Sequence, residues 1–214
     1  MCGITGSLTL AAHSVAFLET SVTAMSAALL HRGPDSLGAW TEGESGIALG
    51  HRRLAIQDLS QAGHQPMVSA CGRFVIAFNG EIYNHLELRA ELNSGQPSAS
   101  NAIDWRGHSD TETLLAGISA WGLGTTLKRC VGMFAIALWD RAERTLTLAR
   151  DRLGEKPLYY GWVGQGDQAA FAFASELKAL RAYPGFANPV DRQSLAQYLC
   201  FMYVPAPRSI YQGI

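Results

Sequence analysis

MFAIALWDRAERTLTLA, residues 133–149, is the stretch of sequence that decides the fold. An apolar run, Met133 to Asp140, is followed by a short charged connection at 141–144. The next segment, Thr145 to Ala149, alternates, with Leu146 and Leu148 on one side. Two short runs of this kind, joined by a short polar connection, are typical of a β-hairpin. The stretch therefore predicts two antiparallel strands.

Further strands are predicted on both sides of this hairpin. Tyr159 to Val163 and Ala170 to Ala174 flank a Gly-rich turn and indicate a second hairpin. Short strands are also expected at Gly3 to Leu10, Ile47 to Ile56 and Arg73 to Phe78. Hairpins imply antiparallel pairing, so the sheets of this protein are expected to be antiparallel.

Helices are fewer than strands. The first is expected at Val15 to His31, where four apolar residues fall on one helical face (Leu18, Val22, Met25 and Leu29). The others are expected at His85 to Leu92, from the capping box Ser109-Asp-Thr-Glu112 to Trp121, and at Arg192 to Leu199. Residues 93–108 are polar and predict a surface loop. An α+β protein with an antiparallel two-sheet core and outer helices fits this order, although periodicity alone does not exclude other α+β arrangements.

Composition narrows the class of protein. The chain has 214 residues, 48% hydrophobic and 16% charged, with a net charge of −1, which is typical of a globular protein. Without a basic excess we expect no nucleic-acid partner, and without an apolar run of about 18–20 residues we expect no membrane span. The four cysteines form no close pair and no N-terminal basic signal region occurs, so we expect a reducing, cytoplasmic location.

Other common sites have no support in the sequence. The histidines and cysteines lack metal-type spacing, so no metal site is predicted. No P-loop, no Rossmann fingerprint and no nucleophile elbow occurs, so no cofactor is expected in this chain. Three of the cysteines are interpreted as ordinary small buried side chains, and Cys2 is the exception.

Cys2 directly follows the initiator methionine. If Met1 is removed, Cys2 carries a thiol and a free α-amine whose unperturbed pKa is about 7.7–8.0. Such an amine can accept the thiol proton near neutral pH, so that the nucleophile needs no separate base. A cysteine at this position can equally occur by chance, and other segments must decide.

The segment FNGEIYNH, residues 78–85, offers one such indication. Asn-Gly is the strongest short hairpin-turn signal, and taken alone Asn79-Gly80 favours a turn. The alternative is an oxyanion hole, in which the Asn79 side-chain amide and the Gly80 backbone N–H stabilise a developing negative charge.

Charged residues elsewhere allow two interpretations each. Arg53 could bind a carboxylate with two hydrogen bonds or form a surface ion pair. Asp110 could bind an ammonium group or simply favour a helix N-terminus, and Ser109 is interpreted as the helix cap. The segment RDRLGEKPLYY, residues 150–160, predicts either solvated ion pairs or a buried network that supports a site.

Eight motifs, in order, resemble one family. MCGI, HRGPD, GHRRLAI, FNGEIYNH, HSDTE, GMFAIALWD, RDRLGEKPLYY and SELKAL are similar to the glutaminase half of glutamine-hydrolysing asparagine synthetases. That half is a class II glutamine amidotransferase domain, one branch of the N-terminal nucleophile (Ntn) hydrolases. The resemblance covers the chain from Cys2 to Ile214.

The resemblance implies a four-layer αββα sandwich of two antiparallel sheets. It implies that Cys2 attacks the side-chain amide of L-glutamine, with Asn79 and Gly80 as the oxyanion hole, and that glutamate and ammonia are released. Arg53 would bind the substrate carboxylate and Asp110 its ammonium. The rest of the glutamine site would be formed by Leu54, Ala55, Ile56, Gln57 and Glu81.

The resemblance also implies a second domain. We expect residues 2–190 to form the amidotransferase domain and 191–214 to begin a connector to an ATP-dependent synthetase domain, since no SGG-x-DS loop occurs here. ATP and Mg²⁺ are expected only in that absent domain, and a homodimer is possible. The acceptor of ammonia would be aspartate, as in asparagine biosynthesis. The alternatives are a sugar acid of lipopolysaccharide (O-antigen) biosynthesis, or a non-catalytic binding domain with the same fold.

Overall fold

The protein is described by a computed structural model that covers residues 1–10, 13–94 and 103–214. Residues 95–102, half of the surface loop predicted at 93–108, lie outside the described residues.

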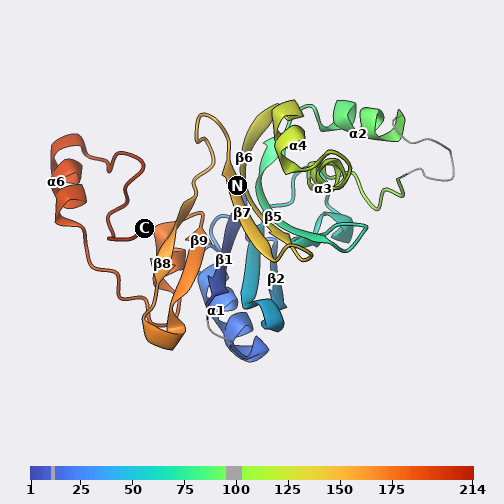
Figure 1. Ribbon diagram of the computed structural model, residues 1–214. Helices are drawn as coiled ribbons and strands as arrows, with labels where there is room; N and C mark the ends of the chain where they lie inside the picture. Colours follow the sequence, from blue (N-terminus) through green and yellow to red (C-terminus); the bar gives the residue numbers. More distant parts are fainter. Residues whose placement is uncertain (11–12, 95–102) are drawn as a thin grey trace.

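Two antiparallel sheets form the centre of the molecule (Figure 1). The first sheet has the order β2-β3-β1-β9-β8 and the second the order β4-β5-β6-β7. The strands of the first sheet are β1 (Gly3–Thr9), β2 (Ser36–Glu42), β3 (Ile47–Arg53), β8 (Tyr159–Val163) and β9 (Ala170–Ala174). Those of the second are β4 (Met67–Val68), β5 (Phe74–Ile82), β6 (Gly132–Asp140) and β7 (Thr145–Arg150).

Both predicted hairpins are confirmed. β6 pairs with β7 in antiparallel register from Ala135–Arg150 to Asp140–Thr145. β8 pairs with β9 with the bounds that the sequence predicted. β1 lies at the middle of its sheet, between β3 and β9, so the strand that follows Cys2 has a paired neighbour on each side.

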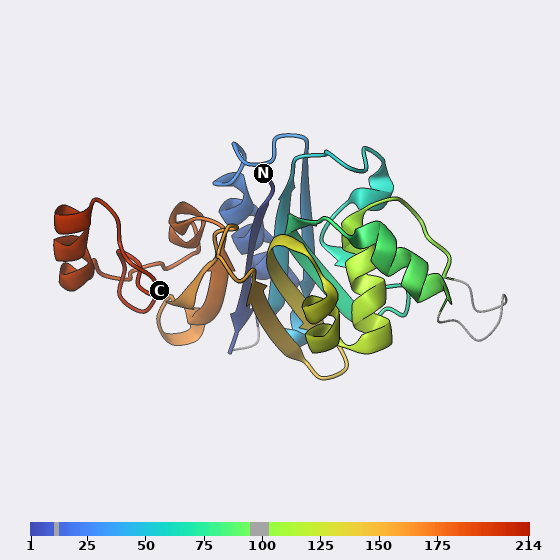
Figure 2. The same cartoon turned by 90° about the horizontal axis from the view of Figure 1, so that it is seen from above.

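Helices cover the outer face of each sheet and give four layers (Figure 2). The helices are α1 (Val15–Ala27), α2 (His85–Ser94), α3 (Asp110–Trp121), α4 (Leu123–Arg129), α5 (Leu177–Arg181) and α6 (Arg192–Phe201). Residues of α1 and α5 pack on the first sheet, and residues of α2 and α3 pack on the second. The predicted four-layer αββα sandwich is confirmed.

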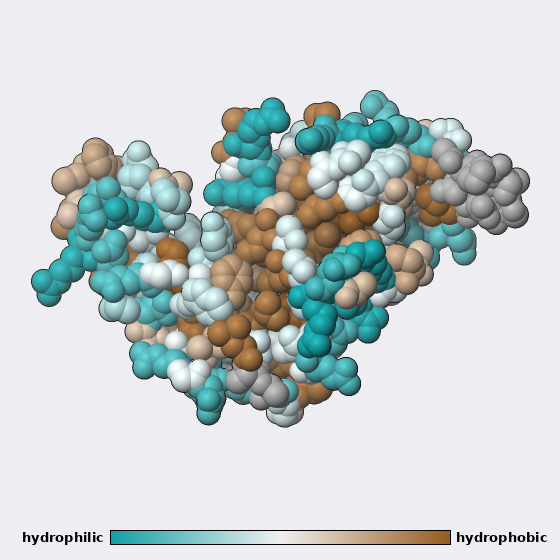
Figure 3. Space-filling model, in the orientation of Figure 1, coloured by the Kyte–Doolittle hydropathy of each residue, from teal (hydrophilic) through white to brown (hydrophobic). Residues whose placement is uncertain are grey.

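The sheet residues show why the chain folds in layers. Successive side chains of a strand point to opposite faces, so a strand buried on both faces is apolar throughout. In β6 the residues Ala135, Ala137 and Trp139 pack between the sheets, whereas Ile136 and Leu138 pack under the helices. In the space-filling view, brown apolar residues gather over the middle of the face and teal polar residues surround them (Figure 3).

Several predicted bounds were wrong. α1 ends at Ala27, and the residues up to His31 form turns, although Leu18, Val22, Met25 and Leu29 are all buried as predicted. β3 ends at Arg53 and not at Ile56. The turn that Asn79-Gly80 favours when taken alone does not form, because both residues lie inside β5, which stays paired with β6 as far as Ile82.

The last helix, α6, stands apart from the sandwich beyond β8 in both ribbon views (Figures 1 and 2). Within the described ranges of the chain, no helix has both the length and the apolar character needed to cross a membrane.

Candidate active site

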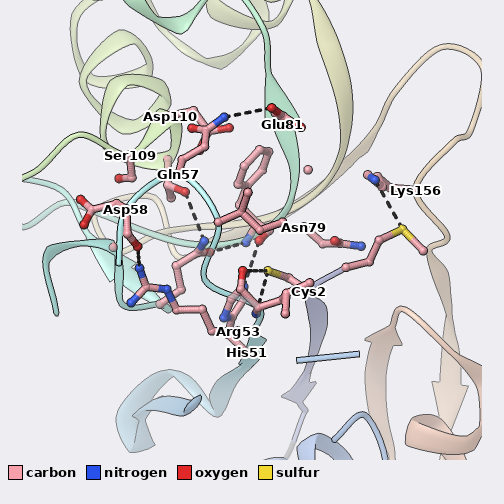
Figure 4. A pocket seen from close by; sticks show the side chains of 18 of the residues that line it. Cys2, His51, Arg53, Gln57, Asp58, Asn79, Glu81, Ser109, Asp110 and Lys156 are labelled. Carbon is pink, nitrogen blue, oxygen red and sulfur yellow. Dashed lines mark hydrogen bonds between the residues drawn. The ribbon is translucent and has the colours of Figure 1, made fainter. Parts of the chain in front are cut away.

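A cavity of about 170 Å³ opens where β1, β3, β5 and the first turn of α3 meet (Figure 4). The structure brings nine of the predicted site residues to its wall: Cys2, Arg53, Leu54, Ile56, Gln57, Asn79, Gly80, Glu81 and Asp110. Ala55 is the exception, because it does not line the cavity and its backbone N–H donates to Asp35.

The Cys2 sulfur lies against the backbone of Leu54, just beyond β3. The Leu54 N–H donates to Sγ over 3.4 Å, and Sγ lies 3.6 Å from the Leu54 carbonyl oxygen. The Cys2 carbonyl oxygen accepts a 2.9 Å hydrogen bond from Arg32 Nε. The sulfur is thus positioned by main-chain contacts at the start of a central strand.

The amides along one edge of β5 face the cavity side. Phe134 uses both its N–H and its carbonyl with Asp151, so Gly80, its partner on β5, belongs to a pair without ladder hydrogen bonds. The amides two residues away on either side are taken by side chains: Phe78 N–H by Gln65 Oε1 at 2.7 Å, and Ile82 N–H by Asp110 Oδ2 at 2.9 Å. Between them the Gly80 N–H is left to the cavity.

Only glycine fits at position 80. A Cβ there would lie 2.4 Å from the Met133 carbonyl oxygen, which is main chain and cannot move aside. The Asn-Gly pair that indicated a turn is therefore explained by a close approach of β6.

The side chain of Asn79 is buried, and no hydrogen-bond partner for its Nδ2 exists in the part of the chain that the structure describes. An unpaired buried donor costs about 1–3 kcal/mol, so such groups are rare unless a ligand satisfies them. Nδ2 of Asn79 and the Gly80 N–H are two donors at one cavity wall.

Arg53 is buried and forms no surface ion pair among the described residues. Its guanidinium donates to the main-chain carbonyls of Ser60 (2.8 Å) and Asp58. Gly63 allows this enclosure, because a Cβ there would lie 2.3 Å from an Arg53 nitrogen. A guanidinium held by neutral carbonyls keeps its charge available for an anion in the cavity.

The opposite wall carries two carboxylates (Figure 4). Glu81 accepts a 3.2 Å hydrogen bond from Gln57 Nε2. Asp110 is buried at the start of α3, and burial raises its pKa to about 6, although its hydrogen bond from Ile82 N–H opposes the shift. This wall is suited to a cation.

His51 also lines the cavity and is fully buried. Burial lowers its pKa to about 3, so the ring is neutral near pH 7. Its Nε2 lies 3.1 Å from the Phe78 carbonyl oxygen and must donate the proton, which leaves Nδ1 unprotonated. Sequence reasoning missed His51, since nothing local to GHRR marks its burial.

The family model for the glutamine amidotransferase domain matches residues 1–214. The chain belongs to the glutamine amidotransferase domain family.

Similar proteins agree with this assignment. The chain is 38% identical over 210 residues to asparagine synthetase 3 (glutamine-hydrolysing) of Bacillus subtilis, covering 92% of this chain and 30% of that protein. It is 41% identical over 191 residues to a Mycobacterium tuberculosis protein that is provisionally named a glutamine-hydrolysing asparagine synthetase, covering 86% and 28%. The amidotransferase domain therefore spans under a third of the length of these relatives.

A solved structure supports the fold. The glutamine phosphoribosylpyrophosphate amidotransferase of B. subtilis, in complex with ADP and GMP, superposes with a TM-score of 0.65 at 22% sequence identity, covering 89% of this chain and 45% of that chain.

In the RDRLGEK segment of the amidotransferase domain, Asp151 and Lys156 are buried, as the buried-network interpretation predicted, whereas Arg150, Arg152 and Glu155 are exposed. The carboxylate of Asp151 accepts hydrogen bonds from the amides of Phe134, Glu155 and Lys156. Arg150 Nε donates to the Lys156 carbonyl oxygen over 2.6 Å. Lys156 is buried and lines the cavity, a position that no local signal predicted.

Two smaller predictions had opposite outcomes. Ser109 caps α3 as predicted, since its side chain accepts from the Glu112 N–H. The prediction of three buried cysteines was wrong, because Cys71 and Cys200 are exposed and Cys130 is half-buried. All four thiols are free.

Proposed function

We propose that this domain hydrolyses L-glutamine to glutamate and ammonia, with Cys2 as an N-terminal nucleophile after removal of Met1. The observation that carries the proposal is the common cavity of three groups: the Cys2 sulfur, the unpaired Asn79 amide and the Arg53 guanidinium. Taken one at a time from the sequence, each of these groups had an ordinary structural explanation. Those explanations do not account for the presence of all three groups at one cavity.

The proposed reaction begins with transfer of the Cys2 thiol proton to its own α-amine. The thiolate then bonds to the side-chain carbonyl carbon of glutamine, and the oxygen that becomes negative accepts hydrogen bonds from Asn79 Nδ2 and the Gly80 N–H. The carbon–nitrogen bond breaks as the ammonium returns its proton to the leaving group, so that ammonia departs. A thioester remains, and water then releases glutamate and the thiol.

Recognition of a free amino acid fits the charges of the cavity. Arg53 would bind the α-carboxylate, and Asp110 would bind the α-ammonium with support from Glu81. A glutamine residue within a peptide lacks both charges, so the two groups would select the free amino acid.

For the acceptor of ammonia we propose aspartate, in a synthetase domain that uses ATP and Mg²⁺. The relatives described above are named as asparagine synthetases, and none of them is named for lipopolysaccharide assembly.

The proposal that residues 2–190 form the domain and 191–214 begin the connector is supported by exposed apolar side chains along α6 and after it: Tyr198, Leu199, Phe201, Met202 and Tyr203. Four free thiols agree with a cytoplasmic location. Homodimer formation stays a prediction.

The first test is glutamate release from glutamine by the purified protein, with intact mass used to confirm that the chain begins at Cys2. Cys2→Ala is expected to lower the rate by at least about 10³-fold, because no other group can form the thioester. Cys71→Ala is the matched control, since it removes an exposed thiol and should leave the rate unchanged. Turnover by Cys2→Ala at the wild-type rate would refute the assignment.

The remaining alternative, a non-catalytic domain, is tested with the same protein. This alternative predicts that glutamine is never hydrolysed, whether or not it binds, even when the mass shows that Met1 is absent. Formation of a covalent glutamyl adduct on Cys2, trapped by acid quench and located by peptide mass, would exclude it.

A further inference from the structure

We infer that Lys156 is a positioning residue whose positive charge keeps the α-amine of Cys2 neutral, and therefore able to accept the thiol proton. This inference rests on the proposed function.

Lys156 is buried although it carries a charge, and it has an unusual partner. Its side chain lines the same cavity as Cys2, and its ammonium lies 3.4 Å from the Met1 sulfur, a weak acceptor (Figure 4). None of the ion pairs found in the described part of the chain involves Lys156. A buried ammonium normally has a carboxylate partner, so its location here calls for another explanation.

The loop that carries Lys156 is fixed at several points. Asp151 accepts the Lys156 N–H at 3.1 Å, and Arg150 Nε donates to the Lys156 carbonyl oxygen. Gly154 has a φ of +69°, which favours glycine, and its amide donates to the Asp151 carbonyl oxygen. The chain thus holds this cation at the cavity by its backbone.

The geometry sets the distance between the ammonium and the Cys2 amine. The Met1 side chain and the following peptide bond span about 6 Å when extended, so Nζ lies within about 10 Å of the Cys2 nitrogen. Removal of Met1 takes away the sulfur, and Cys2 and Lys156 both line one cavity. Repulsion at that distance, with an effective dielectric constant of about 20, lowers the amine pKa by about one unit.

Other charges near this corner are paired or already engaged. Arg32 lies 4.0 Å from the Met1 sulfur but is bound by Glu176 at 2.9 Å, and the Asp151 carboxylate is bound by three amides. The other titratable groups of the loop and the cavity are Arg150, Arg152, Glu155, His51, Arg53, Asp58, Glu81 and Asp110. Lys156 and Arg53 are both buried cations without an ion-pair partner among the described residues, and Lys156 is the one that lies against Met1, the residue before Cys2.

The test compares Lys156→Met, which removes the charge at similar length, with Lys156→Arg, which restores it. The matched control is Lys128→Met, which removes an exposed lysine of α4. The pKa of the Cys2 amine is measured by competitive acetylation across pH, in protein shown by mass to begin at Cys2. The rate of glutamate release at saturating glutamine is measured across the same pH range.

Lys156→Met should raise the amine pKa by about one unit and move the acidic limb of kcat to higher pH by the same amount. At a pH below the amine pKa of both the wild type and the variant, kcat of Lys156→Met should be about tenfold lower than that of the wild type. At high pH the two kcat values should be equal. Lys156→Arg and Lys128→Met should behave as wild type. Local damage would instead lower the rate at every pH.

An unchanged amine pKa in Lys156→Met overturns the inference but not the proposed function, provided that the wild type hydrolyses glutamine. Absence of turnover and of a Cys2 adduct in the wild type overturns the proposed function itself. The acetylation measurement still reports whether Lys156 shifts the amine in that case.

Discussion

The two ends of the cavity are built differently. The thiol end, defined by Cys2, Leu54, Asn79 and Gly80, is formed by the starts, ends and interiors of strands in both sheets, and its contacts to the sulfur are main-chain groups. The charged end, defined by Arg53, Glu81 and Asp110, depends on a loop that wraps a guanidinium and on the first turn of a helix. The thiol end, where a bond would break, is held by main-chain groups of the strands. The charged end, where a substrate would be recognised, carries the charged side chains.

This difference predicts a division of kinetic effects. Donors that act on the developing oxyanion stabilise the transition state more than the bound substrate, so their loss lowers kcat. Groups that bind the two charges of the amino acid act in the ground state and the transition state alike, so their loss mainly raises KM.

The thiol end is tested most directly at Asn79. Asn79→Leu removes the amide donor with little change in shape and should lower kcat for glutamine by about 10²–10³-fold, with KM within a few-fold of the wild type. Because Nδ2 has no partner in the described residues, its removal should not lower the melting temperature. A fall in stability with an unchanged kcat would show that Asn79 has a structural role.

The sequence predicted the hairpins and the layered core because these depend on alternation within short segments. β8 and β9 have the predicted bounds, since each is five residues with turn residues between them. The turn interpretation of Asn79-Gly80 is excluded by tertiary structure, because β6 runs beside both residues and the glycine is needed for close approach of the strands. Strand β2 was not predicted either, and its pairing with β3 is likewise a long-range property.

The candidate site divides in the same way. Residues with a recognisable chemical type in a motif, such as Cys2 and Arg53, could be named from the sequence. His51 and Lys156 could not be named, because their importance depends on burial at one cavity wall. The two residues are about a hundred positions apart along the chain, so no local pattern shows that they share this wall. The family resemblance supplied the roles of the named residues but did not reach these two.

The charged end is tested next, at Arg53. Arg53→Lys keeps the charge but cannot donate to the carbonyls of Asp58 and Ser60 while also binding a carboxylate with two hydrogen bonds. We expect KM for glutamine to rise by about 10–100-fold and kcat to change only a few-fold. Arg73→Lys is the control, because Arg73 is an exposed partner of Asp140.

Gly63→Ala sharpens the test while leaving Arg53 in place. The added methyl group would displace the guanidinium, so KM should rise as in Arg53→Lys. If both variants lower kcat and leave KM unchanged, the charged end does not act mainly in substrate binding, and the proposed division between the two ends is wrong.

The smallest expected effect is a pH dependence of recognition at Asp110. Its pKa is raised to about 6 by burial, so the carboxylate is charged above pH 6 and becomes neutral as the pH falls through that value. A neutral Asp110 cannot attract an α-ammonium, and KM should therefore rise by up to about tenfold for each pH unit below 6, with little change above pH 7.

Asp110→Asn isolates this contribution. Its side-chain oxygen can still accept the Ile82 N–H, so α3 and β5 should keep their contact while the charge is lost. KM in this variant should be raised at pH 7.5 and should no longer change between pH 5 and 7. A KM that still rises on acidification in Asp110→Asn would assign the titration to another group, and Glu81, which lies beside Asp110 on the same wall, would be the next to replace.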